Sequence, residues 1–397
     1  MSYARLPLKR LGEVHLGKMI QPEPKNPSDV AAPYLRAAHV QPNGRLIDVD
    51  DKKMWFRDGE LELHELLADD VVIVEGGAGY GRSAVLREDR IGWGFQNSIV
   101  RVRPRRSLAN GRFVDYALQS ALVSGEIEVA CFTATIPHFT ADKVGAFRVP
   151  APPVGDQQAI ADYLDRETAR IDTLIEEQQR LIKLLQERRE AEADALLGSP
   201  VDARRTTVKR VLRKLSRPAV PKVGVVTAFR DGVVTLRSNR REDGYTFSDT
   251  EHGYQEIRPG DLVFHALDGF AGAVGISDSQ GNATPVYHVC EASSGDHPPY
   301  VARLLRYLGR SGFLSTQAPN VRERSVDFRN WSMFGRLPLT LPPLPEQRRV
   351  AALLDGQATR IGILIAETQR FIELSQERRA ALITAAVTGQ IDVREVA

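Results

Sequence analysis

Two segments of the chain carry apolar positions at alternating steps of three and four residues, the spacing that places side chains on one face of an α-helix. In residues 156–200 the stripe comprises Leu164, Ile171, Leu174, Leu181 and Leu185, widened by Ile175 and Ile182. In residues 346–389 it comprises Leu354, Ile361, Leu364 and Phe371, widened by Ile365 and Ile372. An unbroken helix of about 42 residues is about 63 Å long. The pattern predicts two long helices, whose matching stripes we expect to pack on each other as an antiparallel coiled coil.

The two predicted helices belong to an internal repeat. Residues 152–189 align without gaps on residues 342–379, and about half of the aligned positions are identical. Such repeats indicate a recurring structural unit. The helices follow two segments of domain size, residues 1–155 and 201–345, and residues 390–397 remain as a C-terminal tail. We therefore predict an α+β fold with a pseudo-twofold repeat, in which two mixed α/β domains are separated by two long helices.

Within each predicted domain, the pattern changes to short strands and turns. An acidic turn precedes an apolar strand in residues 69–74 and again in residues 259–264, and a glycine-rich segment follows each time. The two domains are alike in this order of elements but differ in most residues. That combination suggests one fold used for two different surfaces.

Composition narrows the class of protein. With 42% hydrophobic and 26% charged residues the chain should fold, and no apolar run approaches the roughly 18 residues of a membrane helix. We expect a cytoplasmic protein without membrane contact. Cys131 and Cys290 are far apart and have no neighbours at metal-ligand spacing, so neither a disulfide framework nor a metal site is predicted.

A glycine-rich segment, residues 76–83, resembles a phosphate-binding loop. Arg82 stands where such loops carry lysine, and no amphipathic helix is predicted after the segment. We favour a tight strand-to-strand turn, which uses the backbone freedom of glycine, or a DNA-facing loop that exposes Tyr80 and Arg82. A nucleotide-hydrolysing enzyme remains an alternative.

Residues 297–300, His-Pro-Pro-Tyr, differ at their first position from the motif of amino-methyltransferases. That chemistry needs an acceptor for the target amine, which histidine at this place is unsuited to provide. We therefore expect a non-catalytic chain. A coiled-coil assembly protein with no DNA role is the second alternative.

Local charge points to nucleic acid, although the net charge is only +2. Residues 82–112 hold about eight arginines, a local excess of roughly six positive charges. Arginine and asparagine make bidentate contacts to base edges. The predicted DNA-contacting residues are Tyr80, Arg82, Arg101, Arg103 and Arg105 in the first domain and Arg230, Arg237, Asn239, Arg240, Arg241, Arg322 and Arg324 in the second.

The whole array resembles the specificity subunits of type I restriction-modification systems. The resemblance is carried by Pro152-Pro153 with Asp156-Gln157, by Leu341-Pro342-Pro343 with Glu346-Gln347, and by the Glu-Arg-Arg triplets at residues 187–189 and 377–379. It covers nearly the whole chain, is specific in the helices and is loose in the domains. Gly155 and Gly356 depart from the pattern, and Gly356 lies inside the second predicted helix.

The resemblance implies a function and a set of partners. Each domain would read one half of a split, asymmetric site in double-stranded DNA, and the helices would fix the gap between the halves. Two methyltransferase subunits and two restriction subunits would assemble on the chain. Adenine methylation, ATP-driven cleavage and their cofactors, S-adenosylmethionine, ATP and magnesium, would belong to those partners, which leaves this chain without cofactor or metal.

Overall fold

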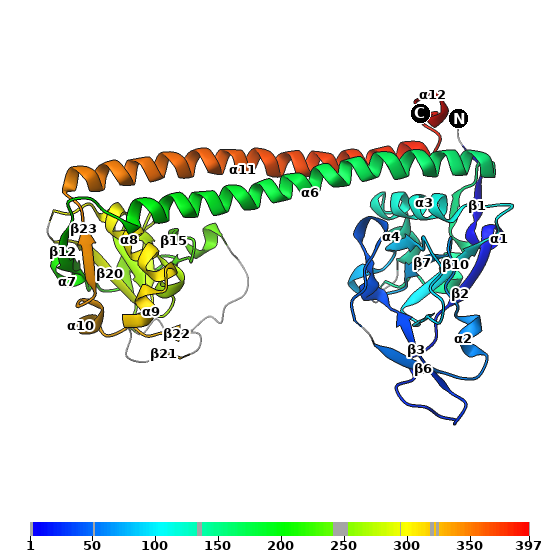
Figure 1. The fold of residues 1–397 in the computed structure, drawn as a ribbon, viewed down its shortest axis with the longest axis horizontal. Coiled ribbons are helices and arrows are strands. Elements are labelled where there is room, and N and C mark those ends of the chain that lie inside the picture. Colours follow the sequence, from blue (N-terminus) through cyan, green and yellow to red (C-terminus); the bar gives the residue numbers. More distant parts are fainter. Residues whose placement is uncertain are drawn as a thin grey trace. The chain divides into compact units, whose positions relative to one another are not determined.

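The structure, a computed structural model, describes residues 3–50, 52–132, 137–240, 253–293, 295–317, 321–322 and 325–396 (Figure 1). The chain forms two compact units. Unit 1 comprises residues 1–179 and 369–397, and unit 2 comprises residues 180–368. Two long helices, α6 (Val154–Gly198) and α11 (Leu344–Val387), each contribute one part to either unit.

Unit 1 is a mixed α/β structure built mainly on short antiparallel strands. Its strands are β1 (Arg5–Pro7), β2 (Gly12–Leu16), β3 (Val30–Leu35), β4 (Val40–Gln41), β5 (Arg45–Leu46), β6 (Lys53–Phe56), β7 (Val71–Val74), β8 (Ser83–Val85), β9 (Gly94–Phe95), β10 (Ile99–Pro104) and β11 (Arg148–Pro150). Its helices, besides the part of α6 and the part of α11, are α1 (Leu8–Leu11), α2 (Glu60–Leu63), α3 (Gly111–Val123), α4 (Glu126–Cys131), α5 (Ala141–Ala146) and α12 (Val393–Val396), and its 3₁₀ turns are η1 (Ala37–His39), η2 (Pro42–Gly44) and η3 (Gly77–Gly79).

Unit 2 contains elements of the same kinds. Its strands are β12 (Arg204–Thr207), β13 (Leu212–Lys214), β14 (Val226–Ala228), β15 (Val234–Leu236), β16 (Gln255–Ile257), β17 (Leu262–His265), β18 (Val274–Ile276), β19 (Gly281–Ala283), β20 (Tyr287–Ala292), β21 (Val321–Arg322), β22 (Ser325–Val326) and β23 (Pro338–Leu341). Its shorter helices are α7 (Val208–Val211), α8 (Pro298–Arg310), α9 (Phe313–Gln317) and α10 (Trp331–Phe334), and its 3₁₀ turns are η4 (Arg237–Asn239) and η5 (Gly269–Ala271).

The two units repeat one topology. Unit 1 has a four-stranded sheet in the order β2-β10-β7-β8, and unit 2 has one in the order β13-β20-β17-β18. All pairs in these sheets are antiparallel. In each unit the first strand pairs with the last strand before the long helix, β1 with β11 and β12 with β23. The predicted fold class and its internal repeat are therefore confirmed.

One helix covers each sheet. Val114 and Leu118 of α3 pack on Val71 and Ile73 of β7, whose neighbour Val72 faces a second cluster on the other side of the sheet. In unit 2, α8 covers β17 in the same way, through Leu304 and Leu305. Strand β7 is buried on both faces because the sheet is central in its unit, which explains its continuous apolar run.

Contacts within each unit set the direction of the long helices. In unit 1, Leu164 near the start of α6 shares a core with Ile383 and Val387 near the end of α11. In unit 2, Leu197 at the end of α6 shares a core with Val350 and Leu354 near the start of α11. The two helices therefore run antiparallel, as predicted. No helix within the described ranges combines the length and the apolar character needed to cross a membrane.

The buried stripe differs from the predicted one at four positions. Leu164, Ile171, Leu354 and Ile361 are at most 7% exposed. Four predicted interface residues are instead 40–47% exposed: Leu174, Leu181, Leu364 and Phe371. The buried positions beside them include Ile175 and Ile372, at 8% and 3%. The stripe follows the alternating three- and four-residue steps through these isoleucines, which the sequence pattern had placed only at its edge.

A buried glutamine fixes the start of each long helix. Gln157 accepts a hydrogen bond from the Asn110 backbone N–H at 2.9 Å and donates to the carbonyls of Leu108 and Pro152. Gln347 accepts from the His297 N–H at 2.9 Å and donates to the Pro342 carbonyl and to Asp296. Asn110 and His297 are the N-cap residues of α3 and α8. Each glutamine therefore joins its long helix to the helix that covers the sheet, and we call this arrangement the glutamine clamp.

The clamps also explain the His297-Pro298-Pro299-Tyr300 motif. Pro298 and Pro299 occupy the first turn of α8, where a missing N–H costs nothing, and Tyr300 is fully buried. The segment starts a helix.

The glycine-rich segment, residues 76–83, forms a turn that leads from β7 into β8, with Gly77 and Gly81 at φ of 79° and 77°. A strand follows this turn, as the strand-to-strand interpretation expected, whereas a phosphate-binding loop would be followed by a helix.

Candidate nucleic-acid interface

The arginine-rich segment of unit 1 is mostly engaged inside that unit. Arg101 was predicted to contact DNA, but its side chain is 2% exposed on the central strand β10. It donates to the Glu65 carbonyl at 2.6 Å and lies over the Phe95 ring, and burial lowers the pKa of its guanidinium. The geometry does not support the predicted DNA contact of Arg101, because alternation along β10 turns this residue toward the interior, where its charge is held by internal bonds.

Arg103, two residues further on the same face of β10, is also committed. Its guanidinium holds the buried carboxylate of Asp70 through two hydrogen bonds of 2.8 Å, and these bonds raise its pKa. A third bond goes to the Glu65 carbonyl. Because the guanidinium already makes two parallel hydrogen bonds to a buried carboxylate, it has no free pair of donors for the edge of a base. The predicted role of Arg103 in DNA contact is therefore not supported by its geometry.

Asp165 of α6 gathers two more arginines of this segment. Arg87 donates to both carboxylate oxygens at 2.8 and 2.9 Å, Arg112 donates at 2.7 Å, and the Tyr116 hydroxyl donates at 2.8 Å. Burial raises the pKa of Asp165, but the hydrogen bonds outweigh burial and bring the pKa down to about 2. Asp355, at the matching position of the repeat, pairs with Arg303. Two of the eight arginines of this segment, Arg87 and Arg112, are thus neutralised by carboxylates of the long helix α6.

We expect replacement of Asp165 by asparagine to destabilise unit 1. The pKa of this carboxyl is lower in the folded chain than its ordinary 3.8, so it stabilises the fold above about pH 4, and this stabilisation disappears as the pH falls toward 2. The shift corresponds to about 2 kcal/mol at neutral pH. Urea unfolding at pH 7 and pH 3 should show a smaller difference between the two pH values for Asp165→Asn than for the parent chain. Asp162→Asn is the control, since its pair with Arg112 is more exposed and should contribute less than about 0.5 kcal/mol.

The remaining predicted residues of unit 1 are more accessible. Arg105 is exposed in the turn after β10, and its side chain makes a long hydrogen bond of 3.5 Å to the Arg10 carbonyl. Arg82 is half-buried and lines a cavity of about 440 Å³ beside α11. Tyr80 packs partly on the unit core. Of the five predicted residues in this unit, Arg105 has the exposure that a phosphate contact requires.

In unit 2 the predicted residues gather around β14, β15 and η4. Arg230 pairs with Asp268 at 3.0 Å and keeps 66% of its side chain exposed. Arg240 pairs with Asp231 at 2.6 Å and lies over the Phe229 ring. Arg237 and Asn239 donate to Thr227 and Thr235. Arg241 and Arg324 lie outside the described residues, as does the side chain of Arg322. The structure therefore brings four of the seven predicted residues together on one surface region.

Two lysines in corresponding loops of the two units were not among the predicted DNA-contacting residues. Lys25 and Lys222 are exposed, and each lies between the first strand of its four-stranded sheet and the next strand. Asp29 holds the first loop by accepting from the backbone N–H groups of Lys25 and Asn26. In Figure 1 this loop lies at the end of unit 1 remote from α3. Prolines next to both lysines are the sequence signal that would have marked these loops as rigid and projecting.

The interface has the chemistry of binding through arginine, lysine and amide groups. Among the described residues, no group of three or more histidine, cysteine, aspartate or glutamate side chains is placed to hold a metal ion. Cys131 and Cys290 are buried and free. The accessible cations of both units suit the phosphates of a nucleic acid, and the exposed loops offer side chains for base edges.

Comparison with known proteins places the fold. No protein-family model and no curated protein matches this chain. A chain solved in a study of complex assembly and conformational transition of the type I R-M system has a TM-score of 0.67 at 13% identity, with 98% of each chain covered. The crystal structure of the HsdS subunit from Thermoanaerobacter tengcongensis has a TM-score of 0.54 at 14% identity, with 98% of this chain and 97% of that chain covered. This chain has the same fold over nearly its full length.

Proposed function

We propose that this chain is the DNA-specificity subunit of a type I restriction-modification complex. Unit 1 and unit 2 share one topology but present different side chains at corresponding surfaces. Such a pair of readers suits a DNA site made of two unlike halves. The observation that carries the proposal is this repeat, with its two antiparallel helices and its full-length likeness to the fold of an HsdS subunit.

The division of labour in the proposed complex follows from the repeat. A chain with internal twofold symmetry presents two equivalent surfaces, so two methyltransferase subunits and two restriction subunits can bind in the same way. One of the two similar solved chains comes from work on assembly of a type I R-M system, which supports partners of this kind. S-adenosylmethionine, ATP and magnesium would be bound by those partners, and this chain would act without catalysis.

Exchange of one domain tests the proposal. Residues 1–155 are replaced by the corresponding domain of another subunit of this fold, and the complex with its methyltransferase is expressed in a host whose DNA is then sequenced for methylated adenine. One half of the methylated sequence should change and the other half should stay. The reciprocal exchange of residues 201–345 should change the other half. A methylation pattern unaltered by either exchange would contradict the proposal.

A further inference from the structure

Unit 2 contains a cavity of about 550 Å³ whose counterpart in unit 1, a cavity of about 440 Å³, has on its wall an arginine that is neutralised by an internal ion pair. In unit 1, Arg379 of α11 is 6% exposed and donates to Asp172 of α6 at 3.0 Å. It also reaches the Gln119 side chain at 3.4 Å and the Asn43 carbonyl at 3.3 Å. The buried guanidinium is thus neutralised by a carboxylate of the neighbouring long helix.

The repeat identifies the corresponding residues of unit 2. An offset of 190 residues relates Arg379 to Arg189 and Asp172 to Gly362. The glutamine clamps relate α3 to α8, because Asn110 and His297 make the same bond. Counting onward from them, Gln119 corresponds to Arg306 and the buried Asp115 corresponds to Ala302. At these two positions unit 2 lacks the carboxylates of unit 1, and it has an arginine in place of Gln119, while the same offset gives it Glu190 and Asp194 in place of Ala380 and Thr384.

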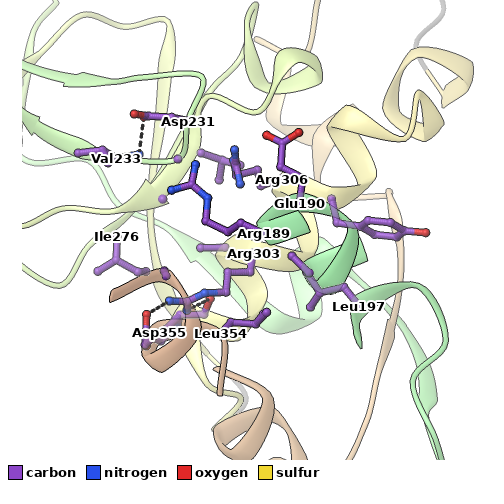
Figure 2. Close-up of a pocket in the computed structure, with 18 of the residues that line it drawn as sticks. Arg189, Glu190, Leu197, Asp231, Val233, Ile276, Arg303, Arg306, Leu354 and Asp355 are labelled. Carbon is purple, nitrogen blue, oxygen red and sulfur yellow. Dashed lines mark hydrogen bonds and ion pairs between the residues drawn. The ribbon is translucent and has the colours of Figure 1, made fainter. Parts of the chain in front are cut away.

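Arg189 and Arg306 line a cavity of about 550 Å³ and lie beside one another in Figure 2. Neither forms an ion pair with a residue that the structure describes. The Arg306 Nε is buried and lacks a hydrogen-bond acceptor. Burial lowers the pKa of Arg306, the charges of Arg310 and Arg189 lower it further, and the carboxylates of Glu190 and Asp231 offset this lowering only in part. A buried guanidinium beside a second cation is costly unless an anion neutralises it.

The acidic residues on the cavity wall are mostly committed elsewhere. Glu190 and Asp194 both face Arg310, at 2.7 and 3.9 Å. Asp355 pairs with Arg303, as Figure 2 shows, and Asp231 pairs with Arg240. Asp278 is exposed and accepts a hydrogen bond from Ser279. Glu190 and Asp231 therefore offset the charge of Arg306 only in part, and an anion in the cavity would complete the neutralisation of Arg189 and Arg306.

The other residues that line the cavity indicate which groups a bound anion would have besides its negative charge. Leu197, Val274 and Leu354 give the cavity apolar surface, and its volume falls in the range of small-molecule sites. The Gln357 Oε1 on the same wall is buried and has no donor. An organic ligand with hydroxyl or amino groups would supply that donor, whereas inorganic phosphate alone would leave the apolar wall uncovered.

We propose that this cavity binds a small phosphorylated ligand of the nucleotide or sugar-phosphate class. Its phosphate lies between Arg189 and Arg306 and replaces the carboxylate that Asp172 supplies to Arg379 in unit 1. Arginine pairs well with phosphate through two parallel hydrogen bonds. The site borders the predicted DNA-contacting residues around β14 and β15, because Asp231 on its wall pairs with Arg240.

Calorimetric titration of the full chain in a phosphate-free buffer tests the proposal. The probes are adenosine monophosphate, inorganic phosphate and adenosine. We expect adenosine monophosphate to bind more tightly than either fragment, and Arg306→Gln, which installs the residue of unit 1, to weaken binding at least tenfold. Equal binding by Arg306→Gln and the parent chain, or absence of binding by all three probes, would overturn the proposal.

Gly362 provides a matched pair of variants. A Cβ at this position would meet nothing within 4 Å, so both Gly362→Ala and Gly362→Asp fit and both remove a glycine from a helix. Gly362→Asp restores the internal carboxylate and should abolish binding, while Gly362→Ala should leave it intact. Since the alanine variant controls for folding, binding that persists in Gly362→Asp contradicts the site.

A short DNA duplex in the same titration distinguishes the source of the phosphate. If the duplex binds with equal affinity to the parent chain and to Gly362→Asp, and adenosine monophosphate binds only to the parent chain, the cavity takes the free ligand. Loss of duplex binding in Gly362→Asp, without binding of adenosine monophosphate to the parent, would assign the arginines to the DNA backbone and overturn the proposal.

Discussion

Replacement of Gln347 by alanine is expected to reduce the free energy of unfolding of unit 2 by about 3 kcal/mol. The side chain is 1% exposed and makes three hydrogen bonds. Its loss strands the His297 N–H and the Pro342 carbonyl in the interior, and each stranded buried group costs roughly 1–3 kcal/mol. Gln157→Ala should have a similar effect on unit 1.

Tryptophan fluorescence during urea unfolding measures the effect in each unit separately. Trp331 lies in unit 2, whereas Trp55 and Trp93 lie in unit 1, so variants that retain only the reporters of one unit assign the loss. Gln158→Ala is the control. That neighbouring glutamine is exposed, and its replacement should change the free energy by less than about 0.5 kcal/mol. If Gln157→Ala costs no more than Gln158→Ala, the clamp does not hold the helix.

Insertion of seven residues into both long helices is expected to lengthen the unread gap in the proposed DNA site. Seven residues add about 10.5 Å of helix and preserve the alternating three- and four-residue steps, so the buried stripe continues. At about 3.4 Å per base pair, the gap should grow by at most about three base pairs. Suitable points are next to Leu181 in α6 and after Thr368 in α11, close to where each helix passes from one unit into the other.

Sequencing of methylated adenine in a host that carries the lengthened subunit and its methyltransferase measures the gap. Both half-sequences should stay the same. Insertion of one residue in each helix is the control, because it turns the following stripe by about 100° and should abolish methylation rather than move it. An unchanged gap in the seven-residue variant would refute the role of the helices as a spacer.

The long helices were predictable because their signals are local. Apolar steps along a helix and an acidic residue in its first turn depend on neighbours a few residues away. The exact stripe was harder to place. Leu174 lies next to Ile175 and Phe371 next to Ile372, and two adjacent apolar residues give no local sign of which one is buried.

The roles of the arginines were not predictable in this way, because their partners are distant in sequence. Arg87 pairs with Asp165 and Arg103 pairs with Asp70, separations of 78 and 33 residues. A count of charges within residues 82–112 treats those arginines as free, whereas the fold neutralises them. The glutamine clamps were visible only as a recurring Gln157 and Gln347, since all of their bonding partners except Asp296 are backbone atoms.

The pairing of β1 with β11 and of β12 with β23 has a consequence for how such chains diversify. Because the first and last strands of each domain pair with each other, the chain enters and leaves the domain at neighbouring points. The whole domain is therefore an insertion at a single place in the chain. Recombination in the gene segments that flank a domain can then exchange the whole domain without dividing its hydrophobic core. Exchange of a whole domain between two chains of this fold would then create a new pair of surfaces in a single step.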